Sequence, residues 1–298
     1  MRMTKGIKVT VIAAFYNDVE LLRLLLDALE AKKTEQLEVI IADDGSSEES
    51  VNQVNLLKEN YSFPVMHLWQ PDAGFNKTII LNKAVVRASG DVLIFIDADC
   101  IPQGSFINDH LKCSNSNVCL VGRRVNVFRD AVKTLNCREP DKIIANNFLT
   151  LFWWSLTGRT NHLERGIRLP SLLNAFLKKE SWGIVGCNFS LQRRDLLAIN
   201  GFDERHGVQW GAEDSDLQRR LQLYGVKLKS LAQQACQIHF DTAFFKRKNK
   251  GHDAAAPEQD YLKLAARENQ YFTPYGIVKG ASMASRSPET EPNGSERS

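Results

Sequence analysis

The sequence lacks several features that would assign it at once to a class of protein. Its six cysteines form no CxxC pair and show no zinc-ligand spacing, which argues against a structural zinc site or a disulfide framework and favours reduced thiols. No apolar run approaches the roughly 20 residues that a membrane-spanning helix needs. The first residues show no cleavage site typical of a signal peptide. These absences together predict a cytoplasmic location.

The chain also lacks a strong charge of either sign. It has 38 basic and 35 acidic residues among 298, a net charge of +3, which predicts no nucleic-acid partner. The dinucleotide fingerprint GxGxxG is absent, so a glycine loop at a helix N-terminus is not expected to hold a phosphate. Hydrophobic residues make up 43% of the chain, which is enough for a sizeable core.

What is present is a regular alternation of strand and helix patterns between residue 7 and about residue 125. In chain order the runs are "KVTVIAAF", "DVELLRLLLDALEA", "LEVIIADDGS", a helix from about 48 to 60, "PVMHLW", "NKTIILNKAVVRA" and "DVLIFIDAD". This βαβαβαβ order predicts an α/β fold with a mostly parallel central sheet flanked by helices on both faces. Asp18 is expected to cap the first helix, and Gly90 to act as the C-terminal stop of the third helix after "VRAS".

Beyond residue 126 the alternation fades, and the second half is expected to decorate the sheet without repeating it. A basic, aromatic stretch is followed by "SWGIVGCNFSLQ"; a helix is expected near 193–200 and a second helix over "WGAEDSDLQRRLQLYG". Residues 246–280 are expected to form a mobile loop and a C-terminal helix, and 281–298 a disordered tail rich in Ser, Pro and Glu.

Polar clusters follow three of the predicted strands, where open parallel sheets bind their ligands. The clusters are "FYND", "DDGSS" and "DAD". Asp97 and Asp99 lie one residue apart, and two carboxylates so placed can bind a divalent cation that in turn bridges a diphosphate. The sequence therefore predicts a metal-assisted diphosphate site at this edge of the sheet.

Taken together, five segments resemble an inverting glycosyltransferase of family 2 with the GT-A fold: "VIAAFYND", "IIADDGSS", "GFNKTIILNKA", "DVLIFIDAD" and "WGAEDSDL". The last also resembles the acceptor-side motif of β-1,4-galactosyltransferases and chondroitin-polymerase modules. Each segment alone is a weak match to the family, and the resemblance rests on the order and spacing of all five. It implies one Rossmann-like domain over residues 1–245, with a nucleotide-binding half over about 7–125 and an acceptor half over about 126–245.

The resemblance also implies roles for residues on the donor side. Tyr16 would stack on uracil, Asp44 would accept the proton on uracil N3, and Lys77 would approach the phosphates. Asp97, Asp99 and His239 would bind the cation, with Mn²⁺ preferred because of the imidazole, and Mg²⁺ possible. The full donor-side set is Ala14, Tyr16, Asn17, Asp43, Asp44, Lys77, Asn82, Asp97 and Ala98.

On the acceptor side, the resemblance implies that Asp214 is the general base and that Glu213 hydrogen-bonds to acceptor hydroxyls. The residues that would line the sugars are Trp182, Gly186, Asn188 and Trp210. The chain departs from the family pattern at three positions: Asn76 replaces an arginine, Thr242 a second histidine, and Cys187 a glycine. The first two affect the expected contacts to the diphosphate, and the third would narrow the sugar pocket.

Other interpretations stay open at this point. An aspartate at a helix start is commonly a cap, and His239 between two apolar residues could be a structural histidine. Trp182 and Trp210 could belong to the core. "FLTLFWWSLTGR" is more typical of a buried helix, although the arginines on both sides of it suit peripheral contact with a membrane. Residues 246–256 could form a lid over the donor.

The expected function is metal-dependent transfer of a hexose or an N-acetylhexosamine from a UDP-sugar to a saccharide or lipid-linked saccharide acceptor. Surface polysaccharide or lipooligosaccharide biosynthesis is the expected setting. One alternative is a carbohydrate-binding or nucleotide-binding protein on the same fold without catalysis. Another is a phosphatase of the HAD type, because "IFIDADC" imitates the aspartate motif of that superfamily.

Overall fold

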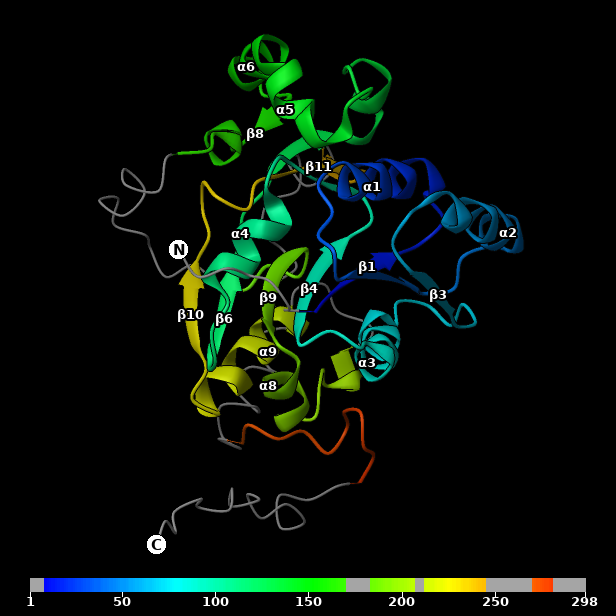
Figure 1. Ribbon diagram of the computed structural model, residues 1–298, viewed down its shortest axis with the longest axis vertical. Coiled ribbons are helices and arrows are strands. Elements are labelled where there is room, and N and C mark those ends of the chain that lie inside the picture. Colours follow the sequence, from blue (N-terminus) through cyan, green and yellow to red (C-terminus); the bar gives the residue numbers. More distant parts are fainter. Residues whose placement is uncertain (1–7, 170–182, 207–211, 245–269, 281–298) are drawn as a thin grey trace, which may run out of the picture.

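A seven-stranded, mostly parallel sheet forms the centre of the protein (Figure 1). The computed structural model describes residues 8–169, 183–206, 212–244 and 270–280. The strand order is β10-β6-β9-β4-β1-β2-β3, and β9 alone among these strands runs antiparallel to its neighbours. The strands are β1 (Val9–Phe15), β2 (Leu37–Asp43), β3 (Val65–Trp69), β4 (Val92–Asp97), β6 (Val118–Val121), β9 (Asn188–Gln192) and β10 (Lys227–Ser230).

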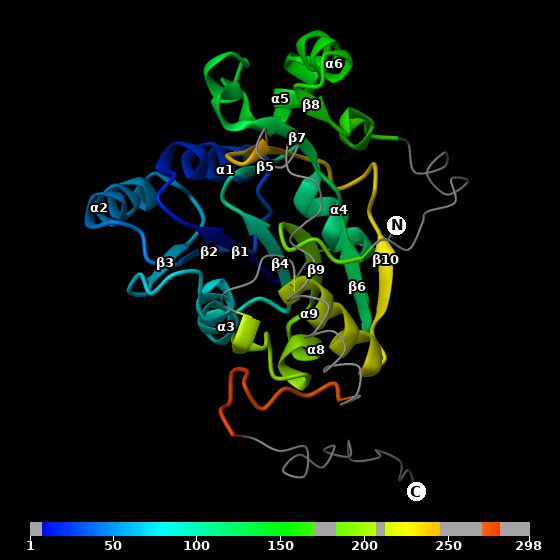
Figure 2. The ribbon, with the colours of Figure 1, turned by 180° about the vertical axis from the view of Figure 1, so that it is seen from behind.

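Helices cover both faces of this sheet because its central strands are apolar on both sides (Figure 2). In β1, Val11 and Ala13 face one core cluster, and Ile12 between them faces the other. The first cluster includes buried residues of α1 (Val19–Ala31), α2 (Glu48–Leu57) and α4 (Phe106–Cys113). The second includes residues of α3 (Lys77–Arg87), α8 (Arg193–Ala198) and α9 (Ala212–Leu223).

A smaller sheet with the strand order β5-β11-β7-β8 adjoins the carboxyl end of β4. Its strands are β5 (Cys100–Pro102), β7 (Val125–Phe128), β8 (Thr160–Asn161) and β11 (Gln237–Asp241). This sheet places His239 opposite both Cys100 and Asn126. The remaining described helices are α5 (Ile143–Asn146), α6 (Phe148–Leu156), η1 (Lys58–Asn60), η2 (Arg129–Lys133), η3 (Pro140–Lys142), η4 (Leu163–Gly166) and η5 (Glu204–His206).

The elements predicted for the first hundred residues are confirmed, and so is the cap of the first helix. The backbone N–H of Leu21 donates to Asp18 Oδ1 over 3.2 Å. The role predicted for Gly90 is wrong, because α3 already ends at Arg87 and Gly90 lies against β1 instead. A Cβ at this position would come within 2.5 Å of the backbone nitrogen of Thr10. Glycine is therefore needed here for close packing of the chain.

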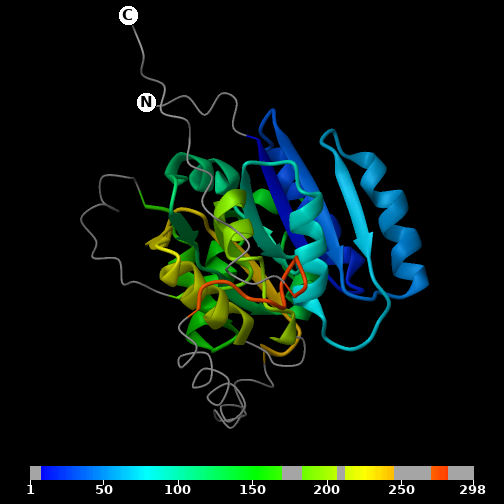
Figure 3. The same ribbon diagram turned by 90° about the horizontal axis from the view of Figure 1, so that it is seen from below.

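The expectation that the second half only decorates the sheet is also wrong. Strand β9 inserts between β4 and β6, and β10 extends the sheet beyond β6. Figure 3 shows the earlier half (blue to cyan) beside the later half (green to yellow). Strands from the two predicted halves therefore share one sheet.

The described part of the C-terminal region, residues 270–280, forms turns and bends with one isolated bridge between Tyr275 and Lys279. The Asn200 side chain anchors it by donating to the backbone oxygens of Thr273, over 2.7 Å, and Val278, over 2.9 Å. The proposed lid, the rest of the predicted loop and helix, and the predicted tail lie outside the described residues.

Helix α6 differs from its expected burial. The pattern favoured a buried helix, but only Leu151 and Trp154 are buried, while Leu149 and Trp153 are among several apolar side chains facing solvent. Within the part of the chain that the structure describes, no helix is both long and apolar enough to cross a membrane.

Candidate active site

The candidate site begins where β1 and β4 end side by side. Their register pairs Ala14 with Asp97, and the backbone N–H of Ala98 donates to the oxygen of Ala14 over 2.8 Å. Strand β1 has β2 on one side and β4 on the other, so the sheet grows outward in both directions from this point. Open α/β sheets bind ligands at such a position. The predicted convergence of the "FYND" and "DAD" segments is therefore confirmed.

Asp99 and His239 meet just beyond the end of β4. Asp99 Oδ2 lies 3.2 Å from His239 Nε2, and His239 Nδ1 lies 3.0 Å from Asn126 Oδ1. Asp99, His239 and Cys100 have candidate metal-ligand atoms within 4.8 Å of one another. A carboxylate and an imidazole are donor types that Mn²⁺ accepts, so these residues fit a divalent cation.

The charges around this pair keep the carboxylate ionised. Burial alone would raise the pKa of Asp99, but His239, followed by Arg124 and Lys77, lowers it below its ordinary value. Burial would lower the pKa of His239, and Asp99 reverses this and raises it. Asp99 is therefore negatively charged over the whole neutral range, as a cation ligand must be.

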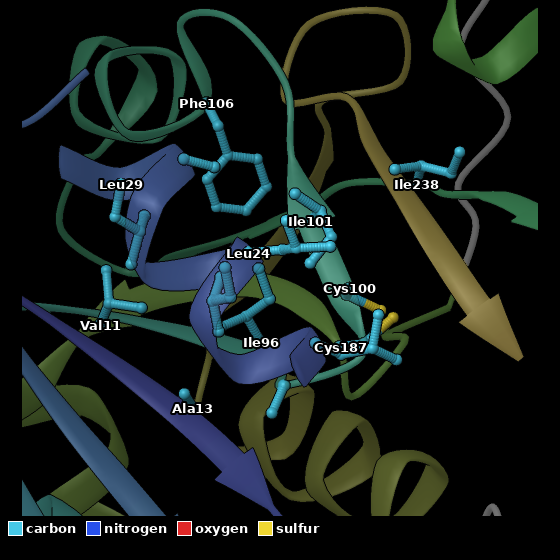
Figure 4. Packing of buried hydrophobic residues seen from close by; sticks show 14 of the residues in the cluster. Val11, Ala13, Leu24, Leu29, Ile96, Cys100, Ile101, Phe106, Cys187 and Ile238 are labelled. Carbon is cyan, nitrogen blue, oxygen red and sulfur yellow. The ribbon is translucent and has the colours of Figure 1, made fainter. Parts of the chain in front are cut away.

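Arg124 lies close to this pair, although no motif in the sequence indicates it as a site residue. Its Nη1 donates to Cys187 Sγ over 2.9 Å. Cys187 and Cys100 are both buried, and Figure 4 shows their sulfur atoms close together. Burial would raise the pKa of Cys187, but the hydrogen bond with Cys100 and the charge of Arg124 lower it to about 6. The arginine adds a fixed positive charge beside Asp97 and Asp99.

Lys77 connects this edge of the sheet with helix α9. It is the first residue of α3, and its Nζ lies 2.5 Å from Asp97 Oδ1. Burial would lower the pKa of Lys77, but the charges of Asp97, Asp214 and Glu213 raise it above its ordinary value. One ammonium group therefore lies within electrostatic range of the strand-end carboxylates and of the acidic start of α9.

Asp214 lies in the first turn of α9, and Gly186 fixes its orientation. The backbone N–H of Gly186 donates to Asp214 Oδ2 over 2.8 Å. A Cβ on residue 186 would come within 2.7 Å of Asp214 Oδ1, so glycine permits this approach. Burial, with the negative charge of Glu213, raises the pKa of Asp214 to about 7. A carboxylate with this pKa can accept a proton near neutral pH.

The side that the resemblance assigns to the nucleotide presents an exposed ring, Tyr16, and a partly buried carboxylate, Asp44. Tyr16 is 55% exposed, and its hydroxyl donates to Asp72 over 3.3 Å, so a face of the ring is open to stacking. Asp44 accepts from Gln70 Nε2 over 2.7 Å and from the backbone N–H of Asn76 over 2.8 Å. Burial raises the pKa of Asp44 in spite of these bonds.

The side chains of Asp43 and Asn17 hold the turn after β2 by accepting hydrogen bonds from its backbone. Asp43 is fully buried, with Oδ1 accepting from the backbone N–H of Ser46 and Oδ2 lying 2.8 Å from His67 Nε2. The Asn17 carbonyl oxygen Oδ1 accepts from the backbone N–H of Ser47 over 2.9 Å. The prediction that the Asp43 side chain reaches the nucleotide therefore needs correction, because that side chain holds the turn after β2.

Two predicted ligand contacts, Asn82 and Asn188, are buried structural amides. Asn82 bonds through both amide atoms to the backbone of Phe202, and through Nδ2 also to Glu204. Asn188 donates to the backbone oxygens of Arg123 and Ala235. Each joins segments that are distant in sequence, so neither amide is directed at a ligand. Trp182 and Trp210 lie outside the described residues.

Comparison with protein families agrees with this geometry. A family model described as glycosyl transferase family 2 matches residues 10–198. A second, described as the N-terminal domain of galactosyltransferase, matches residues 171–246. The latter range contains Gly186 and Asp214.

Curated relatives are larger proteins. The probable glycosyltransferase YdaM of Bacillus subtilis is 26% identical over 227 residues, which are 74% of this chain and 48% of that protein. The chondroitin synthase of Escherichia coli is 24% identical over 284 residues, which are 88% of this chain and 38% of that protein. The chain thus spans less than half the length of these two relatives.

Solved structures share the fold at low sequence identity. The mannosyltransferase PcManGT from Pyrobaculum calidifontis, in complex with GDP-Man and Mn²⁺, has a TM-score of 0.51 at 17% identity, covering 88% of this chain and 70% of that one. GalNAc-T7 with UDP, GalNAc and Mn²⁺ has a TM-score of 0.55 at 14% identity, covering 91% and 52%.

The order of the strands, the polar clusters at their ends and the solved structures all agree with the GT-A fold. The phosphatase interpretation finds no support here, because the family model covers the "IFIDADC" segment as part of a transferase. Since that model spans more than half of the sequence, the chain belongs to glycosyltransferase family 2.

Proposed function

We propose that the protein transfers a hexose or an N-acetylhexosamine, with inversion, from a UDP-sugar to a saccharide acceptor in a reaction that needs a divalent cation. One observation supports this proposal above the others. Lys77 pairs with the strand-end carboxylate Asp97 and lies within electrostatic range of the buried base candidate Asp214, which supports one site that would hold both the diphosphate and the base.

In this proposal Asp214 takes the proton from the acceptor hydroxyl as that oxygen attacks the anomeric carbon. Its pKa of about 7 allows it to be ionised before the attack and to hold the proton afterwards. The Gly186 N–H keeps the carboxylate in one orientation. Glu213, next in sequence and also largely buried, would accept hydrogen bonds from other acceptor hydroxyls.

Positively charged side chains near the strand ends are suited to stabilising the nucleotide as it leaves. Lys77 and Arg124 would attract the diphosphate charge that increases as the glycosidic bond to the donor breaks. Asp99 and His239 would hold the divalent cation, with Asp97 beside them. When bound, the cation supplies additional stabilisation of the negative charge on the leaving diphosphate.

The base of the nucleotide would lie between Tyr16 and Asp44. Uracil carries an N–H donor that suits the Asp44 carboxylate, and the exposed Tyr16 ring offers a stacking face. Guanine also carries donors, and one solved structure with this fold holds GDP-Man while another holds UDP. Choosing UDP is therefore part of the proposal.

The setting that we propose is the assembly of surface polysaccharide or lipooligosaccharide. Two relatives are named as polysaccharide synthases: chondroitin synthase, and the poly-beta-1,6-N-acetyl-D-glucosamine synthase of Staphylococcus aureus, which is 36% identical over 93 residues. The latter match covers 31% of this chain and 22% of that protein. These names support a saccharide acceptor.

Donor hydrolysis with a panel of UDP-sugars and GDP-mannose tests the function. We expect hydrolysis of at least one UDP-sugar with Mn²⁺, loss of that hydrolysis on chelation, and its return when Mn²⁺ is restored. Hydrolysis of GDP-mannose alone would contradict the choice of nucleotide. Metal-dependent UDP binding without transfer to any saccharide would favour the alternative of a non-catalytic binding protein.

A further inference from the structure

Helix α6 presents an apolar surface to solvent, which we name the α6 face: Phe148, Leu149, Phe152, Trp153 and Leu156. Leu149 is 81% exposed and Trp153 is 65% exposed. Leu151 and Trp154, on the other side of the helix, are buried and fix it to the protein. Large apolar side chains gathered on one exposed helix indicate an interaction surface.

The spacing of these residues gives a continuous stripe. Phe148, Phe152 and Leu156 follow one another at intervals of four residues, and Leu149 and Trp153 lie alongside them. Residues 143–158 contain no charged side chain. Helix α6, with nine residues, is about 14 Å long, far short of the roughly 30 Å of a bilayer core. The stripe therefore suits a helix that lies in the surface of a membrane.

The charge of the surrounding segment supports a negatively charged surface as its partner. Residues 129–169, which carry α5 and α6, contain seven basic and four acidic side chains, a net charge of +3. That equals the net charge of the entire chain, so the rest of the sequence is balanced. Arg159 is exposed and lies three residues after the end of α6, and Arg138 is also exposed. Lys133 and Lys142 are exposed as well, but they pair with Asp130 and Glu139.

Not every arginine near this helix belongs to the surface. Arg124 points to the candidate active site, as described above, and Arg129 is paired with Asp18 and Glu20. Arg168 is paired with Asp109. The basic contribution at this end of the molecule therefore comes mainly from Arg138 and Arg159.

The α6 face is joined to the candidate site through one strand. Trp154 packs against Phe128 with ring centroids 5.2 Å apart, and Phe128 is the last residue of β7. Strand β7 pairs with β11 and places Asn126 opposite His239. Figures 1 and 2 both show α5 and α6 standing at one end of the molecule, next to this smaller sheet.

We propose that the α6 face docks on the anionic leaflet of a bilayer, with its aromatic and aliphatic side chains entering the headgroup region and the nearby basic residues meeting lipid phosphates. Tryptophan and phenylalanine are suited to this boundary. Docking brings the site close to an acceptor carried by a lipid, a consequence that rests on the proposed function.

Flotation of the full chain with lipid vesicles tests the proposal. We expect binding to vesicles that contain phosphatidylglycerol at low salt and weaker binding to pure phosphatidylcholine. The variant Leu149→Gln/Trp153→Gln should lose at least about tenfold in binding. Arg159→Gln should lose about fivefold, and only on anionic vesicles. Leu56→Gln is the matched control, because Leu56 on α2 is a 76% exposed leucine outside the α6 face.

No binding by the unchanged chain, or an equal loss in the Leu56→Gln control, overturns the proposal. So does a dimer in size-exclusion chromatography that the double variant converts to a monomer while neither binds vesicles, because the face would then join two copies. Affinity for UDP with Mn²⁺ is measured on the same samples and should stay unchanged in every variant. Failure of flotation with normal UDP affinity refutes the docking alone, and failure of UDP affinity refutes the proposed function.

Discussion

Asp99 and Asp214 are two aspartates of one site with opposite electrostatic surroundings. Asp99 faces the cationic groups His239, Arg124 and Lys77, and its pKa lies below the ordinary value. Asp214 is buried beside Glu213, and its pKa rises to about 7 although Lys77 opposes the shift. The same side chain is thus kept ionised on one side of the site and ready to take up a proton on the other.

This difference indicates a division of tasks between the two edges. A group that holds a cation must stay negative, whereas a group that removes a proton from an alcohol works best with a pKa near the ambient pH. The two requirements cannot be met in one electrostatic environment. The fold separates them by placing Asp99 after β4 and Asp214 on α9, with Lys77 within electrostatic range of both.

Exchanging each aspartate for asparagine should have the largest effects, and the two effects should differ in kind. Asp214→Asn removes the base and should lower turnover on the order of a thousandfold, with UDP affinity in Mn²⁺ almost unchanged. Asp99→Asn removes a candidate cation ligand and should lower the Mn²⁺-dependent affinity for UDP by about 10- to 100-fold. Steady-state kinetics and calorimetric titration with UDP measure the two effects.

Equal loss of turnover and UDP affinity in Asp214→Asn would mean that this residue is structural. Asp216→Asn on the same helix is a useful control for folding. Asp216 is fully buried and bonds to Arg220 over 2.7 Å, so its loss should destabilise the protein.

The pH dependence of turnover should show the titration of Asp214. With Mn²⁺ saturating, kcat/KM should fall about tenfold per pH unit below the Asp214 pKa of about 7 and level off above it. Glu213→Gln removes the negative neighbour that helps to raise this pKa, so the falling limb should move to lower pH. A limb that stays in place in Glu213→Gln would assign the titration to another group. UDP affinity in Mn²⁺, measured over the same pH range, would fall if the protein lost the metal and so separates that effect from the titration of Asp214.

The smallest expected effect is on stability. The folded state raises the pKa of Asp214 from 3.8 to about 7, so it binds this proton more tightly than the unfolded chain does. That contribution is present below about pH 4 and is lost as the pH rises through 7. Asp214→Asn should therefore raise Tm at pH 8 relative to the unchanged chain by about 2 °C or more, with a smaller gain at pH 5. Thermal melts without metal, at both pH values, measure this; a gain that is the same at both would contradict the burial of a charged Asp214.

The strands and the ends of the strands could be predicted from the sequence because they depend on local patterns. Alternation of apolar runs with helix periods located β1 to β4, and parallel topology then placed Asp97 beside Ala14. The pairing of Asp99 with His239 was reached only through the resemblance, since 140 residues separate them and the smaller sheet brings them together.

Roles that depend on buried hydrogen bonds could not be predicted. Asn82 and Asn188 stand in motif-like segments, but their amides are used to join distant backbones. Arg124 could not be predicted for the opposite reason: it stands in no motif, and only the folded chain places it against Cys187. For α6, composition alone did not show that one side would remain uncovered.

The insertion of β9 between β4 and β6 has a consequence for how the protein is made. Until residue 192 has left the ribosome, β4 has β1 on one side and an open edge on the other. Such an edge exposes unpaired N–H and C=O groups that can join strands of other chains. A fragment cut at residue 125 keeps every early strand of the nucleotide-binding half, but it carries that edge permanently, and expressing it alone would yield aggregates in place of a small nucleotide-binding module.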